Sequence, residues 1–151
     1  MLFPKLNKVK LKERRAKMDA NLEKLNDLRE RKGKIMQMGG NERIAAQHKM
    51  GKLTVRERIE KLLDPGSFNE IDALGKHRCT QFGMAVREIP ADAVIVGYGT
   101  LKGRTIFVGG EDFTTSAGTY GEVHGQKLCK ILDMAFTAGA PFIQIDRKSV
   151  V

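Results

Sequence analysis

The sequence predicts an α/β fold, in which helices cover a sheet, and three observations carry that prediction. Roughly the first 63 residues are dominated by helical periodicity. From residue 68 to residue 108 the pattern changes to short runs rich in valine, isoleucine and phenylalanine, which is typical of strands. A second helical stretch, about 121–137, leads directly into an apolar strand at 141–145, and this succession is typical of an α/β layer.

The N-terminal segment, residues 1–40, predicts one basic amphipathic helix that begins near residue 8. Four apolar side chains recur at steps of four, three and three, which places them on one helical face: Met18, Leu22, Leu25 and Leu28. The stripe is thin, so this helix should pack on the rest of the chain or on another subunit. Its net charge of +7, against +2 for the other 111 residues, suits either anion binding or a solvated face.

Two shorter helices are expected next. Asn41 is positioned to cap a helix over 42–50. Thr54 and Glu57 have the spacing of a capping box ahead of an apolar run, which predicts a further helix from residue 55. The buried face of that helix should consist of its apolar residues: Val55, Ile59, Leu62 and Leu63.

The strands are expected at 68–74, 93–99 and 104–108, and residues 100–103 should join the last two as a hairpin. Glycines then crowd the stretch 109–121. The helix that follows should turn its apolar side chains toward the sheet: Val123, Leu128, Ile131, Leu132 and Ala135.

Most patterns of metal or nucleophilic chemistry are missing from the sequence. His48, His77 and His124 share no spacing that suits zinc. Ser116 lacks the glycine context of a hydrolase nucleophile. The glycines near residue 97 begin like a dinucleotide fingerprint, but they lead into a hairpin instead of a helix.

The expected location is the cytoplasm. Cys79 and Cys129 lie far apart in the sequence, which favours unpaired thiols in a reducing compartment over one disulfide. The sequence has neither an apolar run long enough to span a membrane nor the apolar stretch of a secretory signal.

The loop 109–121 is the remaining candidate for a site. It connects a strand to a helix and is rich in glycine and hydroxyl side chains. Glycine lets backbone N–H groups approach a ligand closely, and a helix start directs N–H groups toward anions or carbonyl oxygens. The same composition also suits a tight structural loop, so the residues alone leave both interpretations open.

Several short motifs occur in a characteristic order between Leu28 and Ile145. They include Glu-Arg-Ile-Ala-Ala-Gln-His at 42–48, Gly-Lys-Leu-Thr-Val-Arg-Glu-Arg-Ile at 51–59, Leu-Asp-Pro-Gly-Ser-Phe at 63–68, His-Arg-Cys-Thr-Gln-Phe-Gly-Met at 77–84 and Asp-Phe-Thr at 112–114. Their order and spacing resemble the opening of the carboxyltransferase (beta-type) subunits of biotin-dependent acyl-CoA carboxylases. The nearest type is propionyl-CoA carboxylase and methylmalonyl-CoA decarboxylase.

The resemblance implies a crotonase-like (ClpP/crotonase) superhelix, present here only in part and preceded by N-terminal helices. It also implies that CO2 moves between carboxybiotin and the alpha carbon of a short acyl-CoA, in a direction that the motifs leave open. The biotin would be carried by a partner, a biotin carboxyl carrier protein, and not covalently by this chain. Further expected partners are a biotin carboxylase or decarboxylase subunit and other copies in a homo-oligomer.

The resemblance places the substrate-binding residues in the glycine-rich loop. The residues expected to line the acyl-CoA or its thioester are Phe113, Thr114, Ser116, Ala117 and Gly118. No catalytic side chain and no metal are expected, because backbone N–H pairs hold the enolate in this family. Those pairs belong to a turn beyond the strand at 141–145 and to a second domain, which the sequence does not reach. This loop also departs from the family's common Gly-Gly-Ser, since it has Ala117-Gly118-Thr119.

The expected organisation is an N-terminal helix over 1–40, the first part of a carboxyltransferase N-terminal domain over 41–146, and a non-native tail over 147–151. A buried strand should lead into a tight glycine turn, whereas here it leads into Arg147 and Lys148. The tail also reads as the translation of a sequencing adapter. The chain is therefore expected to be an inactive fragment.

Two other classes of function are alternatives. A nucleic-acid-binding module would use the basic N-terminal helix, but no aromatic residue occurs in residues 5–67 to stack on bases. The other alternative is a non-catalytic fragment that takes part in assembly.

Overall fold

The computed structural model describes residues 8–146 of the chain, and side chains from residue 10 onward. The expected non-native tail at 147–151 lies outside the described residues. The chain divides into two units, residues 1–33 and 34–151, and each is treated by itself below.

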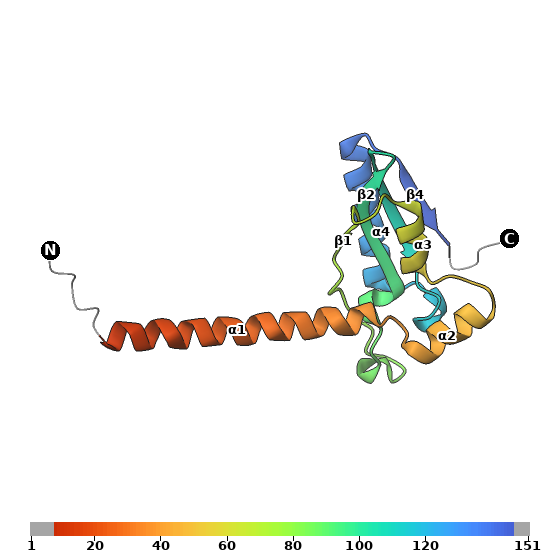
Figure 1. Cartoon of the computed structure of the whole chain (residues 1–151). Helices are drawn as coiled ribbons and strands as arrows, with labels where there is room; N and C mark the ends of the chain where they lie inside the picture. The colour runs from red at the N-terminus through yellow and green to blue at the C-terminus, as the bar shows by residue number, and fades with distance from the viewer. Residues whose placement is uncertain (1–7, 147–151) are drawn as a thin grey trace. The chain divides into compact units, whose positions relative to one another are not determined.

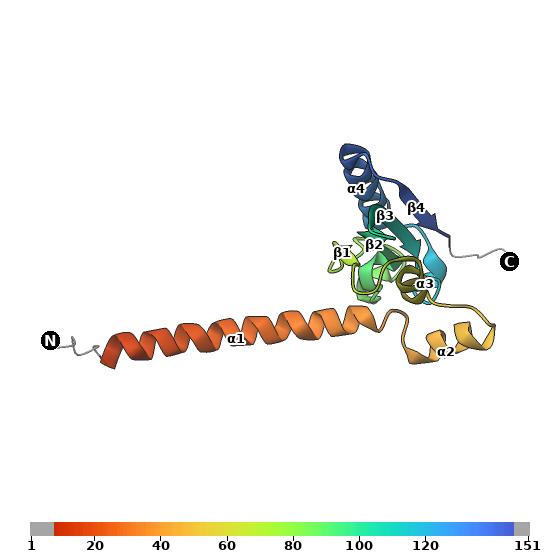
Figure 2. The same cartoon turned by 45° about the horizontal axis from the view of Figure 1, so that its top comes forward.

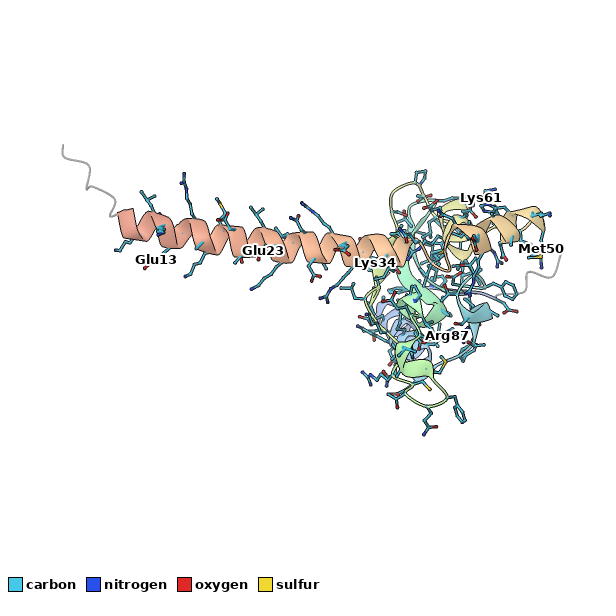
Figure 3. The ribbon with its side chains drawn as sticks, turned by 90° about the horizontal axis from the view of Figure 1, so that it is seen from below. Glu13, Glu23, Lys34, Met50, Lys61 and Arg87 are labelled. Carbon is cyan, nitrogen blue, oxygen red and sulfur yellow. The ribbon has the colours of Figure 1, made fainter. Side chains whose placement is uncertain are left out.

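The first unit consists of most of helix α1, Lys8–Met36 (Figure 1). Figure 3 shows side chains extending from all sides of this helix, among them Glu13 and Glu23. The predicted apolar stripe is at the surface: Met18 is 57% exposed, and Leu28, the least exposed of the four, is 36% exposed. Helix α1 ends at Met36, within the predicted segment 1–40, because residues 37–39 form a turn in which Met38 N–H donates to Ile35 O at 3.0 Å.

Helices α2, Asn41–Lys49, and α3, Val55–Leu62, begin the second unit. The prediction that Asn41 caps α2 is wrong. Asn41 is the first helical residue, and the N-cap is Gly40, whose φ of 91° suits a glycine. Gly40 has no side chain to cap the helix, so α2 starts without the expected side-chain hydrogen bond.

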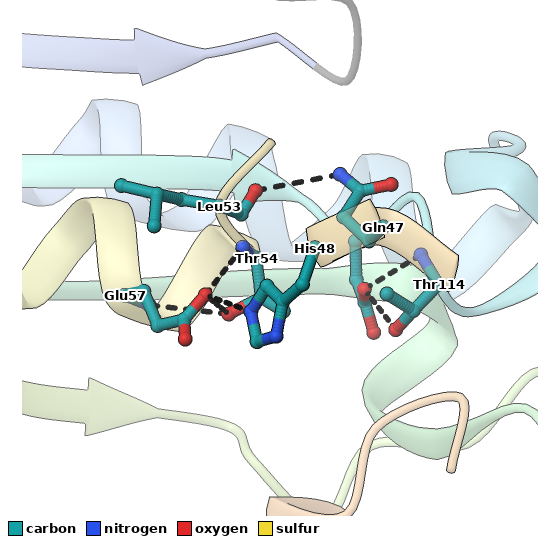
Figure 4. A network of polar contacts seen from close by, with 7 residues as sticks. Gln47, His48, Leu53, Thr54, Glu57 and Thr114 are labelled. Atoms are coloured by element: carbon teal, nitrogen blue, oxygen red, sulfur yellow. Dashed lines mark hydrogen bonds and ion pairs between the residues drawn. The ribbon is translucent and has the colours of Figure 1, made fainter. Parts of the chain in front are cut away.

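The predicted capping box of α3 is confirmed (Figure 4). Thr54 Oγ1 accepts from Glu57 N–H at 3.4 Å, and Thr54 N–H donates to Glu57 Oε2 at 2.7 Å. His48 Nε2, from α2, lies 2.9 Å from the same carboxylate oxygen. These contacts, that of His48 first, hold the pKa of Glu57 below its usual value. The capping box therefore links α2 to α3 in addition to starting α3.

A four-stranded sheet forms the centre of the second unit, in the order β1-β2-β3-β4. Its strands are β1 (Asn69–Ile71), β2 (Val94–Leu101), β3 (Arg104–Glu111) and β4 (Phe142–Ile145). The first three are antiparallel, whereas β4 runs parallel to β3, with Phe107 opposite Phe142. The sheet is therefore mixed, as expected where a helix separates the last two strands.

All four strands differ in length from the prediction: β4 is one residue shorter, β2 extends to Leu101 and shortens the predicted hairpin loop, and β1 and β3 differ most. Strand β1 ends at Ile71 because Asp72, with a φ of 52°, turns the chain and accepts from Gly75 N–H. Strand β3 continues beyond Val108 to Glu111 and so includes two glycines of the predicted loop. A Cβ at Gly110 would overlap the side chain of Val55, so the glycine lets the strand pass closely beneath α3.

Helices α3 and α4, Glu122–Ala138, cover opposite faces of the sheet (Figures 1 and 2). The α3 face packs Val55 and Ile59 onto Ile95, Ile106, Val108 and other apolar side chains. The α4 face packs Ile131 and Ala135 onto Val94, Val96 and Phe107. Neighbouring residues of β2 and β3 thus point to opposite layers, as the pleat of a sheet requires.

The buried face of α4 is only partly the predicted one. Val123, Ile131 and Ala135 are buried, but Leu132 is 45% exposed. Instead, His124 and Lys127 are buried. The first turns of α4 pack on the polar backbone of residues 90–94, and only its later turns reach the apolar sheet.

Candidate functional site

Residues 112–118 (the site loop) form the central part of the loop 109–121 that was predicted to bind substrate, and the buried carboxylate of Asp112 organises them. Asp112 Oδ1 accepts from Thr114 N–H at 2.9 Å and from Thr114 Oγ1 at 2.6 Å. Asp112 Oδ2 accepts from Thr115 Oγ1 at 2.5 Å. All three residues are less than 5% exposed. These hydroxyl groups therefore shape the loop from within.

The site loop is attached to the turn between α1 and α2. Gly39 N–H donates to Thr114 Oγ1 at 3.1 Å, and Arg43 Nη1 donates to Thr114 O at 3.2 Å. A Cβ at Gly39 would overlap the carbonyl oxygen of Thr114, so only glycine permits this approach. Thr114, labelled in Figure 4, therefore forms hydrogen bonds through both its hydroxyl group and its backbone.

The end of the site loop is a left-handed turn. Ser116, Ala117 and Gly118 have φ values of 48°, 54° and 64°. Gly118 N–H donates to Thr115 O at 3.0 Å, and Thr119 N–H donates to Ser116 O at 3.2 Å. Both N–H groups therefore donate to carbonyl groups within the loop. Gly118 is needed there for the left-handed turn and not for binding a ligand.

An open cleft of about 780 Å³ lies beside the site loop. It is lined from three parts of the second unit: residues 34 and 37–43, residues 87, 88 and 90, and residues 115 and 116. Three cationic side chains line it, those of Lys34, Arg43 and Arg87, together with two carboxylates, Glu42 and Glu88. A volume of this size suits a small-molecule ligand.

The structure brings only one of the five predicted site residues to this cleft. Ser116 lines it, joined by Thr115, which was not predicted. Thr114 is buried and Phe113 is 38% exposed. The lining residues include none of Phe113, Thr114, Ala117 and Gly118. The binding role of the five residues remains a prediction.

Sequence reasoning missed the largest part of the cleft, residues 37–43, which comprise the turn after α1 and the start of α2. No binding role was predicted for Gly39 and Gly40. The signal that could have found the turn is the glycine pair itself, since a close backbone approach between distant segments needs a residue without a Cβ. The partner of that approach, Thr114, lies 75 positions away and could not be found from local patterns.

Within residues 8–146, no group of three or more His, Cys, Asp or Glu side chains could hold a metal ion. None of the helices in this part of the chain is long and apolar enough to cross a membrane.

The fold is that of a crotonase-like carboxyltransferase domain. It superposes on transcarboxylase 12S, solved with methylmalonyl-coenzyme A and methylmalonic acid bound, with a TM-score of 0.78 and 40% identity over 80% of this chain and 24% of that one. A model of the carboxyl transferase domain matches residues 46–149, four residues past the point where the resemblance was expected to end. The chain belongs to this family of carboxyl transferase domains.

Curated relatives agree on the type. The methylmalonyl-CoA decarboxylase subunit alpha of Propionigenium modestum is 43% identical over 85% of this chain and 25% of its own length. The mitochondrial propionyl-CoA carboxylase beta chain of Homo sapiens is 52% identical over 72% of this chain and 20% of its own. The chain thus spans about a quarter of the length of these relatives.

Proposed function

We propose that this chain supplies part of the acyl-CoA side of a biotin-dependent carboxyltransferase. The reaction moves CO2 between carboxybiotin, held on a partner protein, and the alpha carbon of propionyl-CoA or methylmalonyl-CoA. The identities of 43% and 52% to enzymes of this type support the substrate class. The two exposed, unpaired cysteines, Cys79 and Cys129, suit the reducing environment of the cytoplasm.

The single observation that carries the proposal is the cleft beside the site loop. Coenzyme A carries several phosphate groups, and arginine binds phosphate through paired N–H groups. Arg43 and Arg87 line the cleft, and Ser116 brings the site loop to its edge. We infer that the phosphates lie toward the arginines, and that Phe113, Thr114, Ser116, Ala117 and Gly118 lie nearer the acyl group.

The proposed partners follow from the chemistry. A biotin carboxyl carrier protein must bring the carboxybiotin, and a biotin carboxylase or decarboxylase subunit must load or discharge it. A hexamer is named for transcarboxylase 12S, which supports a homo-oligomer for the full-length protein.

Calorimetric titration of the chain with propionyl-CoA tests the proposal. Arg87→Gln should weaken binding about fivefold, because an exposed ion pair contributes up to about 1 kcal/mol. Arg104→Gln is the matched control, an exposed arginine at the start of β3 outside the cleft. Equal affinity of all three proteins, or no binding by the wild type, would contradict the proposed cleft.

Assembly without catalysis is a second candidate, and the outer face of α4 favours it. Leu132 and Phe136 are adjacent there, one helical turn apart, and are 45% and 90% exposed. Sedimentation of the wild type against Leu132→Glu tests this candidate. Association that the substitution abolishes would support it, whereas a monomer at all concentrations would reject it.

A further inference from the structure

A buried lysine bonds the backbone of residues 91 and 94, and its bonding is unusual. Lys127, on α4, is 2% exposed. Its Nζ donates to Ala91 O at 2.9 Å and to Val94 O at 2.6 Å. Among the described residues, no carboxylate lies within ion-pair distance of it. Burying a cation that only backbone carbonyls contact costs free energy of folding, so the two hydrogen bonds of Lys127 call for a structural explanation.

The reason lies in the backbone that Lys127 holds. Ala91, Asp92 and Ala93 all have left-handed conformations, with φ values of 52°, 51° and 57°. Three consecutive non-glycine residues seldom adopt this conformation, and they keep it only where their surroundings fix it. We call residues 91–93 the left-handed segment. All three of its residues are less than 6% exposed.

Helix α4 supplies two further bonds to the left-handed segment. His124 N–H donates to Asp92 Oδ2 at 2.7 Å, and His124 Nδ1 lies 3.0 Å from Asp92 O. Gly121 makes room for this carboxylate, since a Cβ there would lie 2.6 Å from Asp92 Oδ2. The Asp92 side chain thereby caps the start of α4, while Lys127 bonds the carbonyls on either side of it.

The left-handed segment in turn reaches the cleft by two routes. Pro90, directly before it, lines the cleft. Ala93 O, at its end, accepts from Asp112 N–H at 2.9 Å. Asp112 is the residue whose carboxylate organises Thr114 and Thr115 of the site loop. The bonds of Lys127 are therefore connected to the site loop through one backbone hydrogen bond.

We propose that Lys127 is a positioning residue: its Nζ fixes the left-handed segment, and that segment fixes the site loop in the conformation that forms the cleft. The assignment of acyl-CoA as the ligand rests on the proposed function, whereas the positioning role does not. Burial lowers the pKa of Lys127 to about 8, which agrees with a group enclosed on all sides.

Hydrogen exchange tests the positioning role directly in the 151-residue chain. Lys127→Met keeps an unbranched side chain, one atom shorter, and removes its donors. We expect the amides of Asp112 and Thr114 to exchange at least tenfold faster, while those of Val96 and Val108 in the sheet stay unchanged. Lys130→Met is the matched control, three residues along the same helix but with its ammonium at the surface, 2.8 Å from Asp72. A uniform change across the sheet and the site loop would mean general destabilisation and would overturn the proposal.

Titration with propionyl-CoA provides a second readout. Lys127→Met should bind it at least tenfold more weakly, and Lys130→Met should bind it like the wild type. If the wild type does not bind, the proposed function fails, while the exchange rates still decide the role of Lys127. If Lys127→Met does not fold, nuclear magnetic resonance of the wild type decides instead. The Nζ group must then show scalar coupling across hydrogen bonds to the carbonyl carbons of Ala91 and Val94, and absence of that coupling sinks the proposal.

Discussion

At the scale of single residues, Lys127 makes stability depend on pH in an unusual direction. Its pKa is about 8 in the folded chain, against 10.5 for an ordinary lysine. Between these values the unfolded chain binds more protons than the folded chain, so the free energy of unfolding rises with pH. Below pH 8 both states are protonated and the cost of the buried charge is fully present.

The prediction compares the wild type with Lys127→Met. From pH 8 to pH 10.5 the wild type should gain up to about 3 kcal/mol relative to the variant. Urea unfolding of both proteins at several pH values measures the difference, in which the titrations of all other groups cancel. A difference that does not vary with pH would show that the ammonium is not buried as described.

Thr54 gives the second prediction at this scale. Thr54→Ala removes the hydroxyl of the capping box and should lower the free energy of unfolding by about 1 kcal/mol. Thermal unfolding measures this, with Thr80→Ala as the control, since Thr80 is an exposed loop residue. An equal shift of the melting temperature in both variants would contradict the capping role of Thr54.

At the scale of elements, two glycine substitutions near the turn between α1 and α2 should change the free energy of unfolding in opposite directions. Gly39→Ala should destabilise the chain and weaken propionyl-CoA binding, because the new Cβ overlaps Thr114 O and must displace the site loop. Gly33→Ala, within α1, meets no atom within 4 Å and should stabilise that helix by up to about 1 kcal/mol. Unfolding curves for both variants test the pair. Two changes of the same sign would contradict the close approach of the turn to the site loop.

Elements that depend on neighbours in the sequence were predictable. The capping box of α3 and the hairpin of β2 and β3 follow from residues a few positions apart. The buried face of α4 did not follow, because periodicity counts apolar residues and so favoured Leu132 over Lys127. The groups that Lys127 bonds are the carbonyls of residues 91 and 94, and no local pattern indicates the left-handed backbone of residues 91–93.

The candidate site, too, was predictable only where it depends on residues that are neighbours in the sequence. The position of the site loop between a strand and a helix was predictable from its glycines. Its internal bonding was not, since Asp112 was taken as part of a motif and not as the group that binds two threonines. The cleft depends on contacts between residues 37–43 and residues 114–116, which come together only in the folded chain.

At the scale of the whole molecule, the prediction concerns activity. This chain alone should form no methylmalonyl-CoA from propionyl-CoA and carboxybiotin. The resemblance to this family implies that both pairs of oxyanion donors lie outside these 151 residues. Loss of even one such donor lowers the rate roughly 10²–10³-fold. A radiolabelled CO2-transfer assay, with a full-length propionyl-CoA carboxylase beta chain in parallel, measures it. Product above the uncatalysed background would refute the prediction.

The sheet topology also sets an order of events for the chain as it folds. Strands β2 and β3 pair across the two residues Lys102 and Gly103, so this hairpin closes a very short loop and should form within microseconds. Strand β4 pairs with β3 in parallel and must wait until the site loop and α4 have crossed the sheet. Helix α4, which carries Lys127, should therefore pack onto a hairpin that has already formed.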